Sequence, residues 1–215
     1  MAHVFLTGVA SGIGRALAEL YLKQNQRVTG IDRKTPDVRI GKFILCDLRS
    51  EESILKAVAE LEGTVDVLIH CAAIYPDVDL GLCQSSIQQV QDSFGTNALG
   101  PLMLTRTLID KGKIASEASV AILSSDMSSI SKNTSGGSYG YRIAKAALNM
   151  FAKNLSIEFP KFNVHCLHPG HVKTPMGGPT APILPADSAV YIAETIRKPA
   201  VSPLVLESKD GKLEW

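Results

Sequence analysis

The sequence has no strong net charge and no long hydrophobic run. Its 22 basic and 21 acidic side chains leave a net charge of +1, so electrostatics give no reason to expect binding to nucleic acid or to an anionic membrane. No uninterrupted apolar run approaches the roughly 18 residues that can span a bilayer. The apolar start at residues 3–7 is too short for a secretory signal and has no basic segment before it. We therefore expect a cytoplasmic protein.

Cysteine is scarce, and metal-binding patterns are weak. His165, His168 and His171 follow one another at the spacing of some metal ligands. Their segment leaves a predicted strand and is interrupted by Pro169-Gly170, so the three rings need not converge. We predict no metal site. Because the four cysteines show no C-x-x-C spacing, we also expect reduced thiols at Cys46, Cys71, Cys83 and Cys166.

Aromatic residues make up only 6% of the chain, whereas hydrophobic residues make up 45%. A core of aliphatic side chains is typical of parallel sheets that are buried on both faces. Short β-branched or aliphatic runs predict strands at residues 4–6, 27–32, 42–46, 65–71, 119–124, 163–167 and 203–207. Segments with helical periodicity alternate with them, at residues 13–22, 54–61, 87–108, 141–159 and 186–197.

This alternation predicts an α/β fold, a Rossmann-type doubly wound parallel sheet in a single domain that spans residues 1–215. Two segments are predicted loops: residues 126–138 are rich in Ser, Asn and Gly, and residues 168–185 contain five prolines and three glycines. Both follow predicted strands. Ligands of open α/β sheets bind outside the carboxyl ends of the strands, so we expect these loops to wall a site.

The first predicted strand runs into a glycine-rich turn, Thr7-Gly-Val-Ala-Ser-Gly-Ile-Gly14. Its spacing differs from the commoner G-x-G-x-x-G, but its physical features are the same. Glycine permits a tight turn and lets the backbone approach a pyrophosphate, which then faces the N-terminal N–H groups of the next helix. An isolated match is as often an ordinary turn. Here the turn lies between a strand and a periodic helix, as dinucleotide binding requires.

Asp32 ends the second predicted strand, 18 residues after Gly14 (32 − 14). A carboxylate near this position accepts hydrogen bonds from the adenosine ribose and repels a 2′-phosphate, which favours NAD. Arg33 keeps NADP open, because its guanidinium can pair with that phosphate. The alternative for Asp32 is an ordinary solvated carboxylate at a strand end.

Tyr141 and Lys145 are four residues apart in a predicted helix, so their side chains share one face, with Cβ atoms about 5–6 Å apart. A lysine ammonium beside a tyrosine favours the phenolate and lowers its pKa from about 10. The pair is therefore a candidate general acid/base. The same spacing also arises by chance, with the aromatic ring packed under a lysine stem.

Together with motifs further along, these features resemble the short-chain dehydrogenase/reductase family. The matches occur in the family's order and cover residues 7–174: the glycine-rich turn, Asp47-Leu48, Asn97, Ser124-Ser125, Tyr141-x-x-x-Lys145 and Pro169-Gly-x-Val-x-Thr174. Within the family, residues 133–142, 175–179 and 210–215 look like the small carbonyl reductases related to sniffer and to bacterial C-factor.

The resemblance implies four catalytic residues. Tyr141 would exchange the proton with the substrate oxygen, Lys145 would lower its pKa and bind the nicotinamide ribose, Ser125 would hydrogen-bond the substrate carbonyl, and Asn97 would hold a water in a proton relay. Cofactor binding would involve Tyr141, Lys145 and a larger set: Gly8, Ser11, Gly12, Ile13, Gly14, Asp32, Arg33, Asp47, Leu48, Cys71, Ala72, Ala73, Pro169, Gly170, Val172 and Thr174.

The chain departs from the family in two places. Cys71-Ala72-Ala73 stands where the family usually has Asn-Ala-Gly, so an asparagine that fixes neighbouring backbone is missing. The position of the serine is also open. Ser125 lies at a strand end but further from Tyr141 than is usual, whereas Ser128 has the usual gap. We prefer Ser125, because a strand end fixes a side chain well and extra loop residues cost little.

The resemblance therefore implies an oxidoreductase that interconverts a small carbonyl compound and its alcohol with a nicotinamide cofactor. It also implies a homodimer or homotetramer that pairs through helix 141–159 and the long helix before it. One alternative is a non-catalytic NAD(P)-binding regulatory or signalling protein. Another is a sugar-nucleotide epimerase or dehydratase. Only 45 residues follow Gly170 (215 − 170), too few for the separate subdomain such an enzyme needs.

Overall fold

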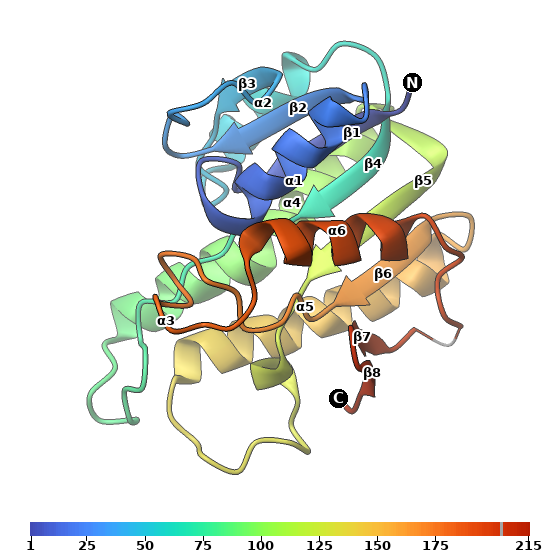
Figure 1. Ribbon diagram of the computed structural model, residues 1–215. Coiled ribbons are helices and arrows are strands. Elements are labelled where there is room, and N and C mark those ends of the chain that lie inside the picture. Colours follow the sequence, from blue (N-terminus) through green and yellow to red (C-terminus); the bar gives the residue numbers. More distant parts are fainter. Residues whose placement is uncertain (203) are drawn as a thin grey trace.

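An eight-stranded sheet forms the centre of the computed structural model, which describes residues 1–202 and 204–215 (Figure 1). The strand order is β3-β2-β1-β4-β5-β6-β7-β8, and every neighbouring pair is parallel except β7 and β8. The strands are β1 (His3–Thr7), β2 (Arg27–Asp32), β3 (Lys42–Leu45), β4 (Val65–His70), β5 (Ile114–Leu123), β6 (Asn163–Leu167), β7 (Leu206–Ser208) and β8 (Gly211–Leu213).

Helices cover both faces of the sheet (Figure 1). On one face α1 (Gly12–Lys23) packs against α6 (Pro185–Ile196). On the other face lie α2 (Glu51–Ala59), α4 (Gly100–Asp110) and α5 (Tyr139–Glu158), with α3 (Ile87–Phe94) against α5. The predicted doubly wound α/β fold is confirmed.

The buried strands explain the aliphatic composition. Successive side chains of a strand point to opposite faces of the sheet. In β1, Phe5 packs into the core beneath α2, α4 and α5, whereas Val4 and Leu6 pack into the core beneath α1 and α6. All three side chains are fully buried. The sheet thus separates two apolar layers, as expected for parallel strands that are covered on both sides.

The predicted elements differ from the structure mainly at two places. The single helix expected over residues 87–108 is divided into α3, a π-helical turn (Gly95–Leu99) and α4. The turn closes with a bond from the Gly100 N–H to the Gly95 carbonyl. Of the strand expected over 203–207, Pro203 lies outside the described residues, and β7 begins at Leu206. The pairing of β7 with the short β8 was not predicted.

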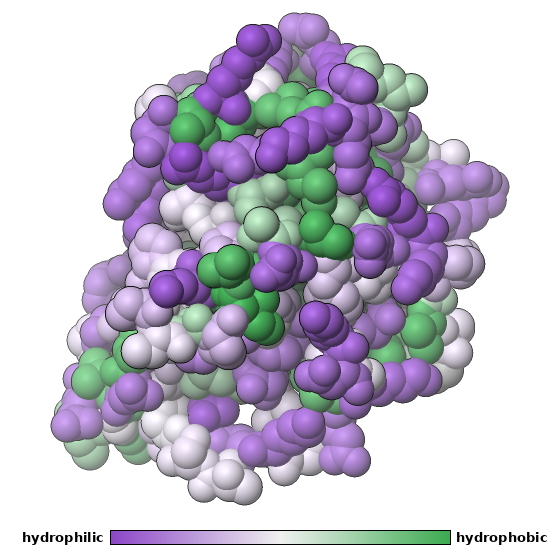
Figure 2. Space-filling view, in the orientation of Figure 1, coloured by the Kyte–Doolittle hydropathy of each residue, from purple (hydrophilic) through white to green (hydrophobic). Residues whose placement is uncertain are grey.

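The surface formed by α1 and α6 is mostly hydrophilic, with small separate groups of hydrophobic side chains (Figure 2). Within the described part of the chain, none of the helices combines the length and the apolar character needed to cross a bilayer.

Candidate active site

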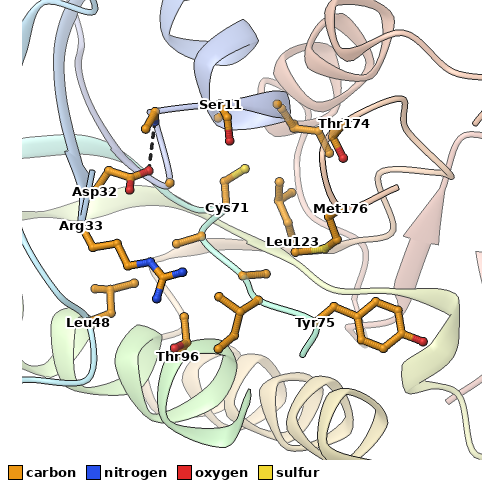
Figure 3. Close-up of a pocket in the computed structure, with 18 of the residues that line it drawn as sticks. Ser11, Asp32, Arg33, Leu48, Cys71, Tyr75, Thr96, Leu123, Thr174 and Met176 are labelled. Atoms are coloured by element: carbon orange, nitrogen blue, oxygen red, sulfur yellow. Dashed lines mark hydrogen bonds between the residues drawn. The ribbon is translucent and has the colours of Figure 1, made fainter. Parts of the chain in front are cut away.

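A cavity of about 670 Å³ opens at the carboxyl ends of β1, β2, β4 and β5 (Figure 3). Most of the predicted cofactor and catalytic residues line it: Gly8, Ser11, Gly12, Ile13, Gly14, Asp32, Arg33, Asp47, Leu48, Cys71, Ala72, Ala73, Tyr141, Lys145, Pro169 and Thr174. The predicted residues Asn97, Ser125, Gly170 and Val172 are not part of its lining.

The glycine-rich turn forms one wall of the cavity. Gly8 has a φ of +77°, and a Cβ built on it would lie 2.7 Å from the Cα of Ala72. A Cβ on Gly14 would lie 2.1 Å from the Gly8 carbonyl oxygen. Both positions therefore require glycine, because no side chain fits where the two backbone segments meet. The turn delivers the chain to the N-terminus of α1, at the edge of the cavity.

Thr7 holds the segment after β4 against this turn. Its hydroxyl oxygen accepts hydrogen bonds from the N–H groups of Cys71 at 3.0 Å and Ala72 at 2.9 Å. The close backbone approach is thus preserved although Cys71 replaces the usual asparagine. Burial raises the pKa of the Cys71 thiol to about 12, so the thiol is protonated at neutral pH. The structure describes all four cysteines, each with a free thiol.

Charged side chains of both signs meet at the end of β2. The Asp32 carboxylate accepts from the Ala10 N–H at 3.0 Å and from the Lys34 N–H at 2.9 Å. The guanidinium of Arg33 points into the cavity (Figure 3), and Lys34 also lines it. Lys34 was not among the predicted residues; its position directly after Arg33 was the signal for it.

At the end of β3, Asp47 is held by Arg49, which donates from its backbone N–H at 2.9 Å and from its side chain. Hydrogen bonds from Arg49 lower the pKa of the Asp47 carboxyl. Arg49 also pairs with Asp92, whose side chain lines the cavity. These two ion pairs fix the outer rim of the cavity.

Tyr141 lies in the first turn of α5, and Lys145 lies one turn further along. The Lys145 ammonium donates a hydrogen bond to the Leu123 carbonyl, at the end of β5, at 2.6 Å. It lies 5.8 Å from the centre of the Tyr141 ring. Both side chains are buried, with 8% of Tyr141 and 3% of Lys145 exposed. The predicted sharing of one helix face is therefore observed, and both residues face the cavity.

The expected lowering of the Tyr141 pKa is not observed. Burial raises the pKa of the phenol to about 12, the Ser125 hydroxyl lowers it, and Tyr75 and Asp126 raise it further. Lys145 is not among the groups that shift the pKa of Tyr141, and its ammonium donates to the Leu123 carbonyl. Burial also lowers the pKa of Lys145 to about 8. The spacing of the pair carried no information about burial, which dominates both shifts.

A segment after β4 clamps the start of α5, and no local pattern in the sequence indicated it. The Tyr75 ring stacks on Tyr141, and its hydroxyl forms a 2.6 Å hydrogen bond with the Ser138 hydroxyl. The buried Asp77 accepts from the Gly140 N–H at 2.6 Å. The Ser138 N–H donates to the Leu80 carbonyl at 2.8 Å. Gly140 and Ser138, just before Tyr141 in the chain, are thus held by contacts from outside the helix.

Ser125 and Ser128 occupy different environments. Ser125 caps a short 3₁₀ turn (Asp126–Ser128), and its hydroxyl oxygen accepts from the Met127 N–H at 3.1 Å. Ser128 points into the interior, where its hydroxyl donates to the Ser125 carbonyl and accepts from the Asn149 side chain at 2.8 Å. Of the two hydroxyls, that of Ser125 is the one that affects the pKa of Tyr141.

Asn97 lies in the π-helical turn, and its fully buried amide grips the backbone of Ile74. Its oxygen accepts from the Ile74 N–H and its nitrogen donates to the Ile74 carbonyl, both at 2.8 Å. Pro101 has no N–H, so it cannot donate to the Asn97 carbonyl four residues earlier.

The loop after β6 contributes Pro169 and Thr174 to the cavity. Val172 is buried and forms a β-bridge with Ile183, which supports the loop from behind. The three histidines have separate partners: His165 contacts Asn163 and Glu207, His168 contacts Asp126, and His171 contacts the Gly177 carbonyl. Among the residues that the structure describes, no three His, Cys, Asp or Glu side chains gather as metal ligands would.

Comparisons with known proteins agree with one another. A family model described as short chain dehydrogenase matches residues 2–182. C-signal of Myxococcus xanthus is 40% identical over 130 residues, which are 60% of this chain and 77% of that protein. The 1-hydroxy-2-glutathionyl-2-methyl-3-butene dehydrogenase of Rhodococcus sp. (strain AD45) is 27% identical over 235 residues, with 100% of both chains covered.

Solved structures have the same architecture over the whole chain. The carbonyl reductase Sniffer of D. melanogaster superposes with a TM-score of 0.87 at 28% identity and covers 100% of both chains. A short-chain dehydrogenase/reductase from Burkholderia multivorans with bound NADP gives a TM-score of 0.88 at 27% identity, covering 100% of this chain and 99% of that one.

Proposed function

The chain belongs to the short-chain dehydrogenase family, and on that basis we propose that it interconverts a small carbonyl compound and its alcohol by hydride transfer with a nicotinamide cofactor. The observation that carries the proposal is the cavity in which Tyr141 and Lys145 face the glycine-rich turn. Likeness to a carbonyl reductase and to a dehydrogenase over full length supports the same reaction class.

The residues present fit a dinucleotide. Gly8 and Gly14 let the turn pack against Ala72 and against itself, and both line the cavity at the N-terminus of α1, where a pyrophosphate would bind. Asp32 would hold the adenosine ribose, Asp47 and Leu48 would flank the adenine, and Thr174 would contact the carboxamide and phosphate region. The bound nicotinamide supplies the hydride acceptor or donor.

Four residues would then position the cofactor, the substrate and the transferred proton. Tyr141 gives its proton to the carbonyl oxygen in reduction and takes it back in oxidation. Lys145 binds the nicotinamide ribose through its ammonium. Ser125 orients the substrate oxygen with its hydroxyl. Asn97 fixes Ile74 through its amide, and its backbone carbonyl is the group that would hold a relay water.

For the cofactor we propose NAD as the preferred form and NADP as a second one. Asp32 brings a negative charge to the place where the 2′-phosphate of NADP would lie, which favours NAD. Arg33 and Lys34 bring two positive charges to the same end of the cavity, which allows NADP. The NADP bound in the Burkholderia multivorans relative supports NADP as the second form.

A second candidate function is a nucleotide-binding regulatory or signalling protein without turnover. The similarity to C-signal of Myxococcus xanthus favours it. The presence of Ser125, Tyr141, Lys145 and Asn97 together argues for the enzyme, because cofactor binding alone needs no proton donor next to the substrate.

We also propose that the protein forms a homodimer or homotetramer through α4 and α5. Large aliphatic side chains on these helices are exposed, among them Leu102 at 41% and Ile157 at 64%. A second copy of the chain would cover them. Sedimentation at micromolar concentration tests this, and a purely monomeric species would contradict it.

The main experiment separates enzyme from regulator. NADH and NADPH are titrated separately by fluorescence, and the absorbance of the reduced nicotinamide is then followed against a panel of aldehydes and ketones. Tyr141→Phe should bind the cofactor as the native protein does and lose turnover. Tyr139→Phe is the matched control, because Tyr139 lies on the same turn of α5 but does not line the cavity. Full turnover in Tyr141→Phe would overturn the proposed mechanism.

A further inference from the structure

The Ser125 hydroxyl is already engaged by the next residue in the chain. Its O–H donates a hydrogen bond to the Asp126 carboxylate at 3.1 Å, and its oxygen accepts one from the Met127 N–H at 3.1 Å. A serine hydroxyl has a single proton to donate. While this hydrogen bond to Asp126 is formed, the Ser125 hydroxyl cannot donate to a substrate oxygen.

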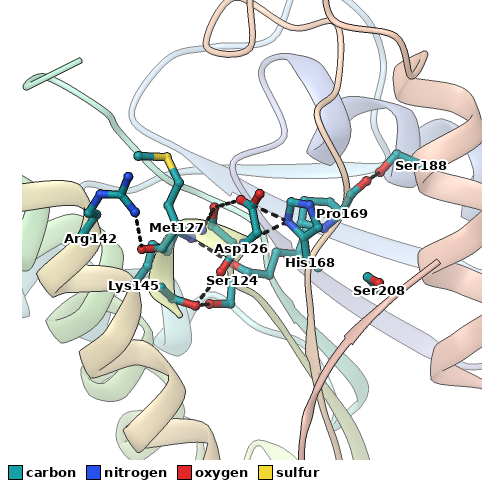
Figure 4. Close-up of polar contacts among 12 residues, drawn as sticks. Ser124, Asp126, Met127, Arg142, Lys145, His168, Pro169, Ser188 and Ser208 are labelled. Atoms are coloured by element: carbon teal, nitrogen blue, oxygen red, sulfur yellow. Dashed lines mark hydrogen bonds and ion pairs between the residues drawn. The ribbon is translucent and has the colours of Figure 1, made fainter. Parts of the chain in front are cut away.

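Asp126 is in turn connected to His168, which follows β6 (Figure 4). The Asp126 N–H donates to Nδ1 of His168 at 3.2 Å, which requires that Nδ1 carry no proton. The Asp126 carboxylate lies 4.0 Å from the same nitrogen. Protonation of Nδ1 would therefore remove an acceptor for the amide and create a donor that faces the carboxylate.

This geometry provides two alternative arrangements. With His168 neutral, the amide is bonded to the ring and the carboxylate is free to hold the serine proton. With His168 protonated, the carboxylate gains a charge-assisted bond to the ring, which is stronger than its bond to a neutral hydroxyl. The side chain of Asp126 is 57% exposed and that of His168 is 19% exposed, so the carboxylate has room to turn.

We propose that Asp126 and His168 are a positioning pair for Ser125: the carboxylate withholds the serine proton while His168 is neutral and releases it when His168 is protonated. The inference rests on the proposed role of Ser125 in binding the substrate oxygen. Asp126 bonds to Ser125 and His168 bonds to Asp126, so both members act through Ser125.

The charges around His168 set where the change occurs. Burial lowers the pKa of His168, and the cationic Lys132 and neighbouring His171 lower it further. Asp126 and Asp210, the latter in the turn between β7 and β8, raise it. The pKa of His168 is lowered overall, so this histidine becomes protonated at a lower pH than an ordinary histidine does.

The test compares kcat/KM for carbonyl reduction between about pH 5 and about pH 8. In the native protein, kcat/KM should rise about tenfold as His168 becomes protonated, the size expected for one charge-assisted hydrogen bond. Asp126→Asn and His168→Asn should abolish the rise, and the amide oxygen introduced by His168→Asn can still accept from the Asp126 N–H. Asp210→Asn is the matched control, which should move the rise to lower pH and keep its size. A flat native profile, or a rise that persists in Asp126→Asn, would overturn the proposal.

A second measurement does not depend on turnover. The ring protons of His168 are titrated by NMR, and Asp126→Asn should lower its pKa because a facing carboxylate is lost. An unchanged value would overturn the pair. Ser125→Ala separates the two levels of inference. Normal turnover in Ser125→Ala would contradict the role of Ser125 in the proposed function. Lost turnover in Ser125→Ala, together with a native pH profile in Asp126→Asn, would contradict the positioning pair alone.

Discussion

The ring of Tyr75 stacks on the ring of Tyr141, with centroids 4.3 Å apart and planes inclined by 30°. Tyr75 comes from the segment after β4, and Tyr141 from the first turn of α5. The stack therefore fixes the phenol from a second element of the fold.

Removal of the stack should loosen Tyr141. We expect Tyr75→Ala to lower kcat/KM by about tenfold, because a misplaced acid costs rate steeply. It should also lower the free energy of unfolding by about 1–3 kcal/mol through lost aromatic packing. Steady-state kinetics and urea unfolding measure the two effects. Tyr75→Phe keeps the ring and loses only the bond to Ser138, so it should retain most of the rate. Equal loss in both variants would show that the hydroxyl, and not the stack, is what matters.

The buried charge of Lys145 should lower the stability of the folded protein near neutral pH. Its pKa falls from 10.5 to about 8 on burial, so the unfolded state binds more protons between these values, and the native protein gains stability as pH rises through this window. Replacement by methionine should therefore stabilise the protein near pH 7 by about 1–3 kcal/mol, less the lost bond to Leu123, while abolishing turnover. The gain should shrink by about pH 10. Urea unfolding at both pH values checks it; a gain independent of pH would contradict the burial argument.

The raised pKa of Tyr141 predicts a difference between the two reaction directions. With a pKa of about 12, the phenol keeps its proton through neutral and mildly alkaline pH. Reduction, which needs that proton, should not decline with Tyr141 between about pH 7 and pH 9. Oxidation needs the phenolate, so its kcat/KM should rise about tenfold per pH unit over that range. Initial rates in both directions provide the measurement, and a steep fall of the reduction rate would count against this assignment.

Asn97 should matter to stability as well as to turnover. Asn97→Ala leaves the N–H and carbonyl of Ile74 without their partners, at a cost of about 2–4 kcal/mol. Asn97→Asp keeps the acceptor for the Ile74 N–H but loses the donor to the Ile74 carbonyl. It should therefore preserve the first hydrogen bond and place two oxygens against each other at the second. Thermal unfolding of both variants, together with cofactor titration, tests the clamp. Native stability in Asn97→Ala would exclude it.

Cofactor preference should depend on one carboxylate. Asp32→Asn removes the negative charge at the end of β2, so the ratio of the NADPH Kd to the NADH Kd should fall by about tenfold or more. Arg33→Ala should raise that ratio. Fluorescence titration of both reduced cofactors gives these constants. An unchanged ratio in Asp32→Asn would mean that the carboxylate serves only the Ala10 and Lys34 amides.

Local patterns predicted the elements well where burial follows a simple period. The bounds expected for β2 and β6 agree with the structure at both ends. The helix predicted over residues 87–108 is helical without a break from Ile87 to Asp110. The π-helical turn inside it was not predicted, because one inserted residue leaves the apolar spacing on each side intact. In that turn Asn97 contacts Ile74, 23 residues away. The spacing of apolar residues along a helix does not predict such a distant contact.

The candidate site shows the same division. Spacing and strand ends identified the residues of the glycine-rich turn, Tyr141 and Lys145. The contributions of Tyr75, Asp77 and His168 depend on which loops meet in space, so no local pattern revealed them. The direction of the Tyr141 pKa shift was wrong for a related reason, since burial depends on the tertiary packing around the pair and not on their separation.

The contact between Thr7 and Ala72 has a consequence for the order of folding. These residues are 65 apart along the chain, and β1 lies between β2 and β4 in the sheet. Closing so long a loop reduces chain entropy before the stabilising contacts form, so such pairings form slowly. During synthesis, the glycine-rich turn near the start of the chain therefore gains its contacts with Cys71 and Ala72 only after the segment that follows β4 has left the ribosome.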